Sequence, residues 1–114
     1  MLKHRIVLVP FPFDDLSAIK VRPAVCLTNP VGPHQHVVLA FITSRIVPNP
    51  LTTDVILDSA ASDFPVTGLR VSSTLQLHRL MTVNLSLIQR ELGALPSRLQ
   101  SEVDLRLQGL FELK

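Results

Sequence analysis

The sequence predicts a mainly β fold with one C-terminal helix, built as a small, strongly bent sheet or barrel. Three observations lead to this prediction. Five or six short segments, rich in β-branched and other apolar residues, alternate with turn-forming residues through most of the chain. Nine prolines in 114 residues disfavour a helical bundle. A helical spacing of apolar residues occurs near the C-terminus.

Size and composition indicate a single domain over residues 1–114. Apolar residues make up 46% of the chain and charged residues 18%, which excludes a disordered protein. A chain of this length buries roughly two-thirds of the surface that its unfolded form exposes, so a conventional core is expected. No apolar run approaches the ~18 residues of a membrane span, and Pro10 and Pro12 break the only apolar run near the N-terminus. Neither a signal peptide nor a membrane association is therefore expected.

Two strands are expected on either side of a long loop in the first part of the chain. Residues 5–9 (RIVLV) are rich in β-branched residues and stop at a proline. Residues 10–22 are expected to be a loop, because their prolines, aspartates and serine suit extended and turn conformations. Residues 23–28 (PAVCLT) follow as a strand whose proline comes first, where it removes no ladder hydrogen bond.

The middle of the chain holds the most apolar strand candidate. Residues 37–43 (VVLAFIT) are continuously apolar, as expected for a strand buried on both faces. A short strand is expected at residues 54–57. Residues 69–77 and 79–85 are two further strand candidates, which can also form one long bent strand. Loops are expected at residues 29–35, 44–53 and 58–68.

An amphipathic helix is expected after Pro96. Ser97, with Gln100 three residues later, forms a capping-box pattern. Apolar residues then recur along one helical face at spacings of 4, 4, 3 and 1. These residues are Leu99, Val103, Leu107, Leu110 and Phe111.

Composition also limits the function. Trp and Tyr are absent and only five Phe occur, which disfavours an RNA reader built on an aromatic platform. Four scattered glycines provide no phosphate-cradling loop. The net charge of +2 does not by itself predict nucleic-acid binding. Eight of the eleven cations are Arg, however, which suits bidentate contact with phosphate or carboxylate.

Neither a disulfide nor a metal site is expected. Cys26 is the only cysteine, which excludes an intramolecular disulfide and favours a cytoplasmic location. His34 and His36 form an H-x-H pattern without a nearby third ligand, so they are expected to be solvated loop residues. Asp14 and Asp15 fit a turn or cap better than a metal site.

Several polar residues lie at expected strand ends or in the first loop. Arg22 precedes the second strand, Thr43 and Ser44 end the apolar strand, and Ser17 lies within the loop. Three of these residues have a structural alternative: an ion pair with a loop aspartate for Arg22, and ordinary turn hydrogen bonds for Thr43 and Ser44. His78 interrupts an apolar pattern, and such a histidine is commonly a satisfied structural residue.

Three segments resemble the MazF/PemK family, the toxins of type II toxin–antitoxin systems. They are IVLVPFPFDDLSAIKVRPAVCL, VVLAFITS and GLRVSSTLQLHRLMTVNLSLI, which together cover most of residues 5–95. The first is the most specific, because it combines F-x-F, D-L-S, a basic residue and R-P-A. The I-T-S of the second segment, at the expected distance, adds independent support.

The resemblance implies an SH3-like β-barrel with a C-terminal helix and a homodimer. It also implies sequence-selective, metal-independent cleavage of single-stranded RNA, usually mRNA, without a cofactor, and neutralisation by a cognate antitoxin. By position, Arg22 is expected to contact the scissile phosphate, Thr43 to be catalytic, and Ser17 to lie near the RNA backbone. Lys20 falls in the basic stretch before R-P and, like Ser44, is expected to contact the substrate.

Two features depart from the family pattern. Many relatives carry Asp-Gln in the strand before an R-T or L-T element, and alignment on Met81 and Thr82 places His78 and Arg79 at those positions. Some members use an arginine two residues earlier as an acid, where this chain has Gln76. The arginine–aspartate version of the mechanism is therefore not expected here, whereas the arginine–threonine version is retained. Gln76 and Arg79 are expected to contact the substrate.

The chemistry fits these groups. RNA supplies its own nucleophile, because the 2′-hydroxyl attacks the adjacent phosphate to give a 2′,3′-cyclic phosphate and a 5′-hydroxyl. Arg22 can donate two parallel hydrogen bonds to that phosphate, acting mainly by electrostatic stabilisation because a guanidinium is a poor acid. Thr43 can share one hydrogen bond with the same oxygens, and His78 is expected to take the 2′-hydroxyl proton.

A second hypothesis is that the chain is a non-catalytic protein of the same fold. It would bind a protein target, as gyrase-poisoning relatives in the superfamily do, or be an inactive remnant. The replaced Asp-Gln pair and the weak net charge favour this alternative. The retained Arg22, Thr43 and Ser17 count against it.

Overall fold

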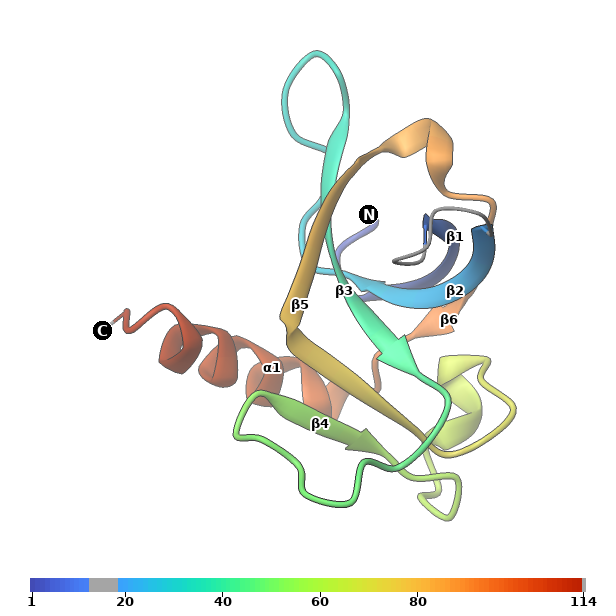
Figure 1. The fold of residues 1–114 in the computed structure, drawn as a ribbon, viewed down its shortest axis with the longest axis vertical. Coiled ribbons are helices and arrows are strands. Elements are labelled where there is room, and N and C mark those ends of the chain that lie inside the picture. Colours follow the sequence, from blue (N-terminus) through green and yellow to red (C-terminus); the bar gives the residue numbers. More distant parts are fainter. Residues whose placement is uncertain (13–18, 114) are drawn as a thin grey trace.

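The computed structural model describes residues 1–12 and 19–113. In this part of the chain six strands form one antiparallel sheet, in the order β4-β5-β3-β2-β1-β6. The strands are β1 (Arg5–Pro12), β2 (Ile19–Cys26), β3 (His36–Thr43), β4 (Asp54–Leu57), β5 (Ser73–Asn84) and β6 (Arg90–Ala94). The sheet curls into a half-barrel, and α1 (Ser97–Leu110) follows it (Figure 1). The mainly β fold with a C-terminal helix is therefore confirmed.

β1 and β2 are longer than predicted. They pair from Ile6 opposite Val25 to Pro12 opposite Ile19, so part of the expected loop at residues 10–22 is strand. The expectation that Pro23 begins its strand is wrong, because Pro23 lies inside β2, opposite Leu8. β6 pairs only with the first half of β1, up to Leu8. The second half of β1 therefore has one neighbouring strand, where proline costs no ladder hydrogen bond.

β5 is one long strand with a sharp bend. Ala40 of β3 pairs with Leu80, but its neighbour Phe41 pairs with Gln76, so residues 77–79 are extra on β5. The segment before the bend also pairs with β4. The long-bent-strand alternative is confirmed from Ser73 onward, and the bend is visible in Figure 1.

Three short elements were absent from the prediction. A 3-10 helix, Phe64–Thr67, lies inside the expected loop at residues 58–68. It packs against β6, where a Cβ on Gly93 would lie 2.3 Å from the Val66 carbonyl oxygen. β6 (RELGA) lacks β-branched residues, so its sequence gives little strand signal. A second 3-10 helix, Leu85–Leu87, links β5 to β6.

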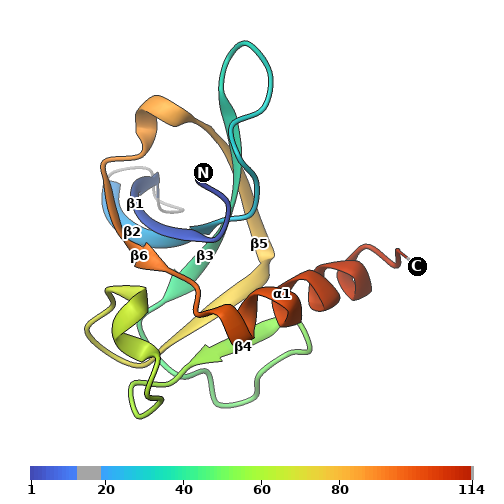
Figure 2. The same cartoon turned by 180° about the vertical axis from the view of Figure 1, so that it is seen from behind.

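The core has two parts because β3 is buried on both faces, as predicted. Successive strand residues point to opposite faces. One face of the sheet holds Ile6, Val25, Ala40, Ile42, Val55, Leu57, Phe64, Leu75, Leu77 and Leu95, against which Leu99 and Val103 of α1 pack. The other face holds Val7, Val9, Ala24, Cys26, Val37, Leu39, Phe41 and Val83. Figure 2 shows α1 lying beside β4 and β5.

The start of α1 differs from the prediction. Pro96 is the N-cap and makes no side-chain cap bond, so the expected capping box of Ser97 is wrong. Gln100 instead donates from Nε2 to the Leu95 carbonyl oxygen at 3.1 Å. The apolar stripe is confirmed up to Leu107, which packs against the core, but Phe111 lies past the helix end and is 55% exposed. No helix in the described ranges is long and apolar enough to cross a membrane.

Candidate functional site

β2 and β3 bring Arg22 and Thr43 together. Ala24 pairs with Phe41 in this ladder, and two residues further along each strand the same register places Arg22 opposite Thr43. Both side chains are half-buried and line one open pocket of about 280 Å³. A guanidinium and a hydroxyl from adjacent strands can therefore reach the same bound group.

β1 and β5 complete this pocket. Its lining consists of Phe11, Arg22, Phe41, Ile42, Thr43, Gln76 and Arg79. Gln76 pairs with Phe41, and Arg79 belongs to the extra residues of the β5 bend. The Phe11 and Phe41 rings lie 4.1 Å apart between centroids, and the Arg79 guanidinium carbon lies 5.9 Å from the Phe11 centroid. The pocket thus combines two guanidinium groups with polar and apolar walls, which suits an anionic phosphate beside an apolar surface.

His78 lies beside this pocket and does not line it. It borders an adjoining hollow of about 220 Å³ that shares Phe11, Phe41 and Arg79 with the pocket. Its Nδ1 lies 3.3 Å from Thr53 Oγ1 and 4.0 Å from Asp54 Oδ1, at the start of β4. The two hollows share these three lining residues and are together called the groove here, with Arg22 lining one and His78 lining the other.

The other expected substrate contacts lie outside the pocket lining. Lys20 is exposed on β2, where it pairs with Phe11, and Ser44 is exposed directly after β3. Ser17 lies outside the described residues, as do both aspartates suggested as partners of Arg22. The expected site residues that share one pocket are thus Arg22, Thr43, Gln76 and Arg79.

His34 lies in an exposed turn, as expected, whereas His36 is the first residue of β3 and not a loop residue. His34 and His36 are exposed, and their ring centroids lie 5.8 Å apart. Across residues 1–12 and 19–113, no group of three or more His, Cys, Asp or Glu side chains is arranged to hold a metal ion.

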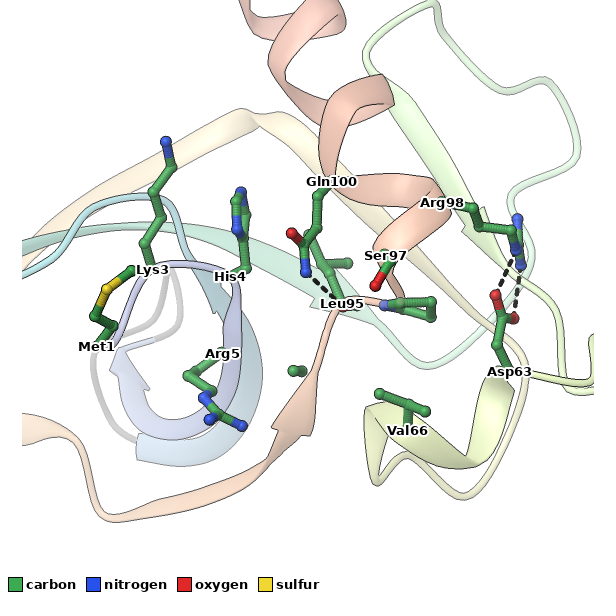
Figure 3. Close-up of a pocket in the computed structure, with 12 residues that line it drawn as sticks. Met1, Lys3, His4, Arg5, Asp63, Val66, Leu95, Ser97, Arg98 and Gln100 are labelled. Carbon is green, nitrogen blue, oxygen red and sulfur yellow. Dashed lines mark hydrogen bonds and ion pairs between the residues drawn. The ribbon is translucent and has the colours of Figure 1, made fainter.

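A larger pocket, of about 610 Å³, lies where the N-terminal segment meets the start of α1 (Figure 3). Arg98 of α1 donates two hydrogen bonds, of 2.6 and 3.0 Å, to the Asp63 carboxylate. The same contact lowers the pKa of Asp63 and raises the pKa of Arg98. This pair ties the turn before the first 3-10 helix to α1, and the pocket contains none of the expected site residues.

Phe11 is a pocket residue that the sequence reasoning did not identify. The sequence predicts a loop at this position, because prolines flank Phe11 on both sides. The sequence feature that could have identified Phe11 as a site residue is its F-x-F pattern. Only the pairing of β1 with β2 shows that Phe11 lies opposite Lys20, two residues from Arg22 along β2.

The protein is similar to solved structures of toxins. The Mycobacterium tuberculosis toxin MazF-mt6 has a TM-score of 0.73 and 25% identity, covering 96% of this chain and 98% of that one. An endoribonuclease in complex with its cognate antitoxin, from a mycobacterial species, has a TM-score of 0.74 and 14% identity, covering 100% and 97%. A further M. tuberculosis toxin has a TM-score of 0.66 and 23% identity, covering 92% and 98%. At 14% and 23% identity, the last two show the fold alone.

A family model describes the class more narrowly. The model for the PemK-like, MazF-like toxins of type II toxin–antitoxin systems matches residues 3–111. The chain belongs to this family. No curated protein matches it by sequence.

Proposed function

We propose that the chain is a sequence-selective, metal-independent endoribonuclease toxin that cleaves single-stranded RNA. The observation that carries the proposal is the convergence of Arg22 and Thr43 on one open pocket in a member of this toxin family. A structural neighbour described as an endoribonuclease bound to its antitoxin is consistent with it.

In the proposed reaction the RNA supplies the nucleophile. The 2′ oxygen bonds to the adjacent phosphorus, the bond from phosphorus to the 5′ oxygen breaks, and the products are a 2′,3′-cyclic phosphate and a 5′-hydroxyl. Negative charge grows on the phosphoryl oxygens in the transition state, and fixed donors stabilise it. Arg22 supplies two such donors in a planar fork, and Thr43 supplies one more hydrogen bond.

The remaining groove residues bind the RNA and move the proton. His78 acts as the base for the 2′-hydroxyl, since histidine is the side chain whose charge changes most readily near neutral pH. Gln76 and Arg79 contact the substrate from the pocket wall. Lys20 and Ser44 contact the RNA backbone, and the resemblance to the family gives Ser17 the same role.

The proposal extends to the partners. A cognate antitoxin covers the Arg22 pocket with an acidic segment and so competes with RNA, because both present negative charge to the same guanidinium. The toxin acts as a homodimer in the cytoplasm.

The test is incubation of the purified protein with long single-stranded RNA in EDTA. The proposal predicts discrete fragments, which Arg22→Ala does not produce. Arg70→Ala is the matched control, because Arg70 is exposed and does not line the pocket. Uncut RNA with correctly folded wild-type protein would contradict the proposal and favour the non-catalytic binding protein.

A further inference from the structure

β4 begins with a carboxylate that is shielded from solvent. The Asp54 side chain is only 3% exposed. Its Oδ2 accepts a hydrogen bond of 2.8 Å from the Leu51 backbone nitrogen, which closes the turn before the strand. Its Oδ1 is buried and has no hydrogen-bond partner in the described structure. A buried carboxylate oxygen without a donor is costly, so a nearby donor is expected to serve it.

His78 is the candidate donor, although its Nδ1 contacts Thr53 Oγ1 at 3.3 Å and lies beyond hydrogen-bond distance of Asp54 Oδ1. Its Nδ1 lies 4.0 Å from Asp54 Oδ1, and the side chain is 36% exposed. The β5 bend holds the ring there, because the Leu77 nitrogen donates a 3.0 Å hydrogen bond to the Thr53 carbonyl oxygen. The Nδ1 atom of His78 therefore faces the start of β4. The same side chain also lines the hollow that adjoins the Arg22 pocket.

We propose that Asp54 is a positioning residue, which accepts the Nδ1 proton of His78 and leaves the Nε2 lone pair directed at the RNA. This inference rests on the proposed function. A neutral imidazole carries one proton, and an acceptor beside Nδ1 selects the form protonated there. During cleavage the 2′-hydroxyl proton moves to Nε2, the 2′ oxygen bonds to phosphorus, and the leaving 5′ oxygen takes a proton from water. Asp54 then stabilises the positive imidazolium.

The charged side chains around this pair come from two elements. Arg79 of β5 borders the same hollow as His78. Arg98, Glu102 and Arg106 of α1 border the surface around Asp54. Arg106 also bonds to Glu102 and to the Thr52 carbonyl oxygen, which braces the turn before Asp54.

The pairing is tested by nitrogen NMR of the histidine rings in the full-length protein. Signals of His78 are assigned by their loss in His78→Gln. The proposal predicts that the neutral wild-type ring is protonated at Nδ1 and that Asp54→Asn shifts it towards the Nε2-protonated form. A wild-type ring protonated at Nε2 would overturn the proposal. This measurement uses the wild-type protein, so it remains decisive even if Asp54→Asn does not fold.

A matched control exists at the other end of β4. Asp58 follows the strand, is exposed, and accepts a 2.9 Å hydrogen bond from the Ala60 nitrogen. Asp58→Asn removes the same charge and also leaves an amide that can cap a turn. It is expected to leave the His78 ring signals unchanged. An equal shift in Asp58→Asn and Asp54→Asn would show a general charge effect and overturn the specific pairing.

Kinetics then test the role in cleavage. Asp54→Asn is expected to lower kcat about tenfold or more with little change in KM, but less than the ~10²–10⁴-fold typical of losing the base itself. In a His78→Gln background the same change is expected to cost less than about twofold, because the two residues act as one unit. An unchanged kcat for Asp54→Asn in an active enzyme overturns the inference. If the wild type cuts no RNA, the proposed function fails, and the NMR result still decides the pairing.

Discussion

Arg22 lies within β2 and Thr43 ends the neighbouring strand β3, and both side chains line the same pocket. The positions of the two side chains are set by strand register, because Ala24 and Phe41 pair in the same ladder. Site residues held by paired strands keep their geometry better than residues on loops. In the proposed function this pair is the preorganised phosphate site.

Loss of the guanidinium should stop cleavage without unfolding the protein. Arg22→Ala is expected to lower single-turnover cleavage by at least about 10²–10³-fold, since it removes the main donors to the phosphate. Arg22→Lys keeps the charge but not the planar fork, so its rate is expected to lie between those of wild type and Arg22→Ala. Circular dichroism checks the fold. Full activity of folded Arg22→Ala would remove this residue from the site.

Loss of the Thr43 hydroxyl should act on the same step. Thr43→Val keeps the shape of the side chain and removes one hydrogen bond, so kcat is expected to fall about tenfold or more with little change in stability. Thr43→Ser keeps the hydroxyl and is expected to retain most of the activity. If the valine and serine variants have equal rates, the hydroxyl has no part in the reaction.

The only cysteine should be inert in the folded protein. Cys26 is fully buried, and burial, with a smaller contribution from the Glu91 carboxylate, raises the pKa of its thiol to about 12. Only the thiolate is strongly nucleophilic. Iodoacetamide at about pH 8 is therefore expected to modify Cys26 only after denaturation, as measured by intact mass. Rapid labelling of the native protein would contradict the buried position.

Stability should fall as the pH drops through the range in which His4 titrates. Burial lowers the pKa of His4 from its ordinary value of 6.5, Lys3 lowers it further, and Asp104 partly opposes both. Below about pH 6.5 the unfolded chain therefore binds a proton more readily than the folded chain, and the free energy of unfolding decreases. The loss ends once the pH is below the folded pKa.

His4→Gln removes this proton-linked contribution. Denaturant unfolding from about pH 5 to about pH 8 is expected to show a weaker dependence on pH for His4→Gln than for wild type. Equal slopes for the two proteins would show that His4 does not couple folding to protonation.

The packing of α1 can be tested with two leucines on the same helix. Leu99 is 3% exposed and packs into the core, whereas Leu105 is 67% exposed. Leu99→Ala is expected to lower the free energy of unfolding by about 2–5 kcal/mol, and Leu105→Ala by no more than about 0.5 kcal/mol. Equal costs would show that α1 does not pack on the sheet through Leu99.

The strands that could be predicted are those with a run of apolar or β-branched side chains. The apolar run at residues 37–43 predicted a strand buried on both faces, and β3 is one. The end of β1 was missed because Pro10 and Pro12 indicate a loop, and the start of β2 was included in the same expected loop. Proline is tolerated in that half of β1 because β6 does not pair with it. Ser97 was misassigned because Pro96 takes the N-cap position.

The candidate site, like the strands, could be predicted only in part. The family resemblance predicted Arg22 and Thr43 as site residues. The pairing of β2 with β3 then brings both side chains into one pocket. The surroundings of His78 could not be predicted, because they depend on the three extra residues in β5 and on Thr53 and Asp54 from another strand. Such contacts join distant parts of the chain, and the local pattern around residue 78 carries no sign of them.

The most direct test of the central claim is chemical mapping of RNA ends after digestion in EDTA, with wild type and Arg22→Ala side by side. The account predicts 2′,3′-cyclic phosphate and 5′-hydroxyl ends at discrete positions for wild type, and none for Arg22→Ala. Fragments with 5′-phosphate ends, or the same fragments from both proteins, would contradict it.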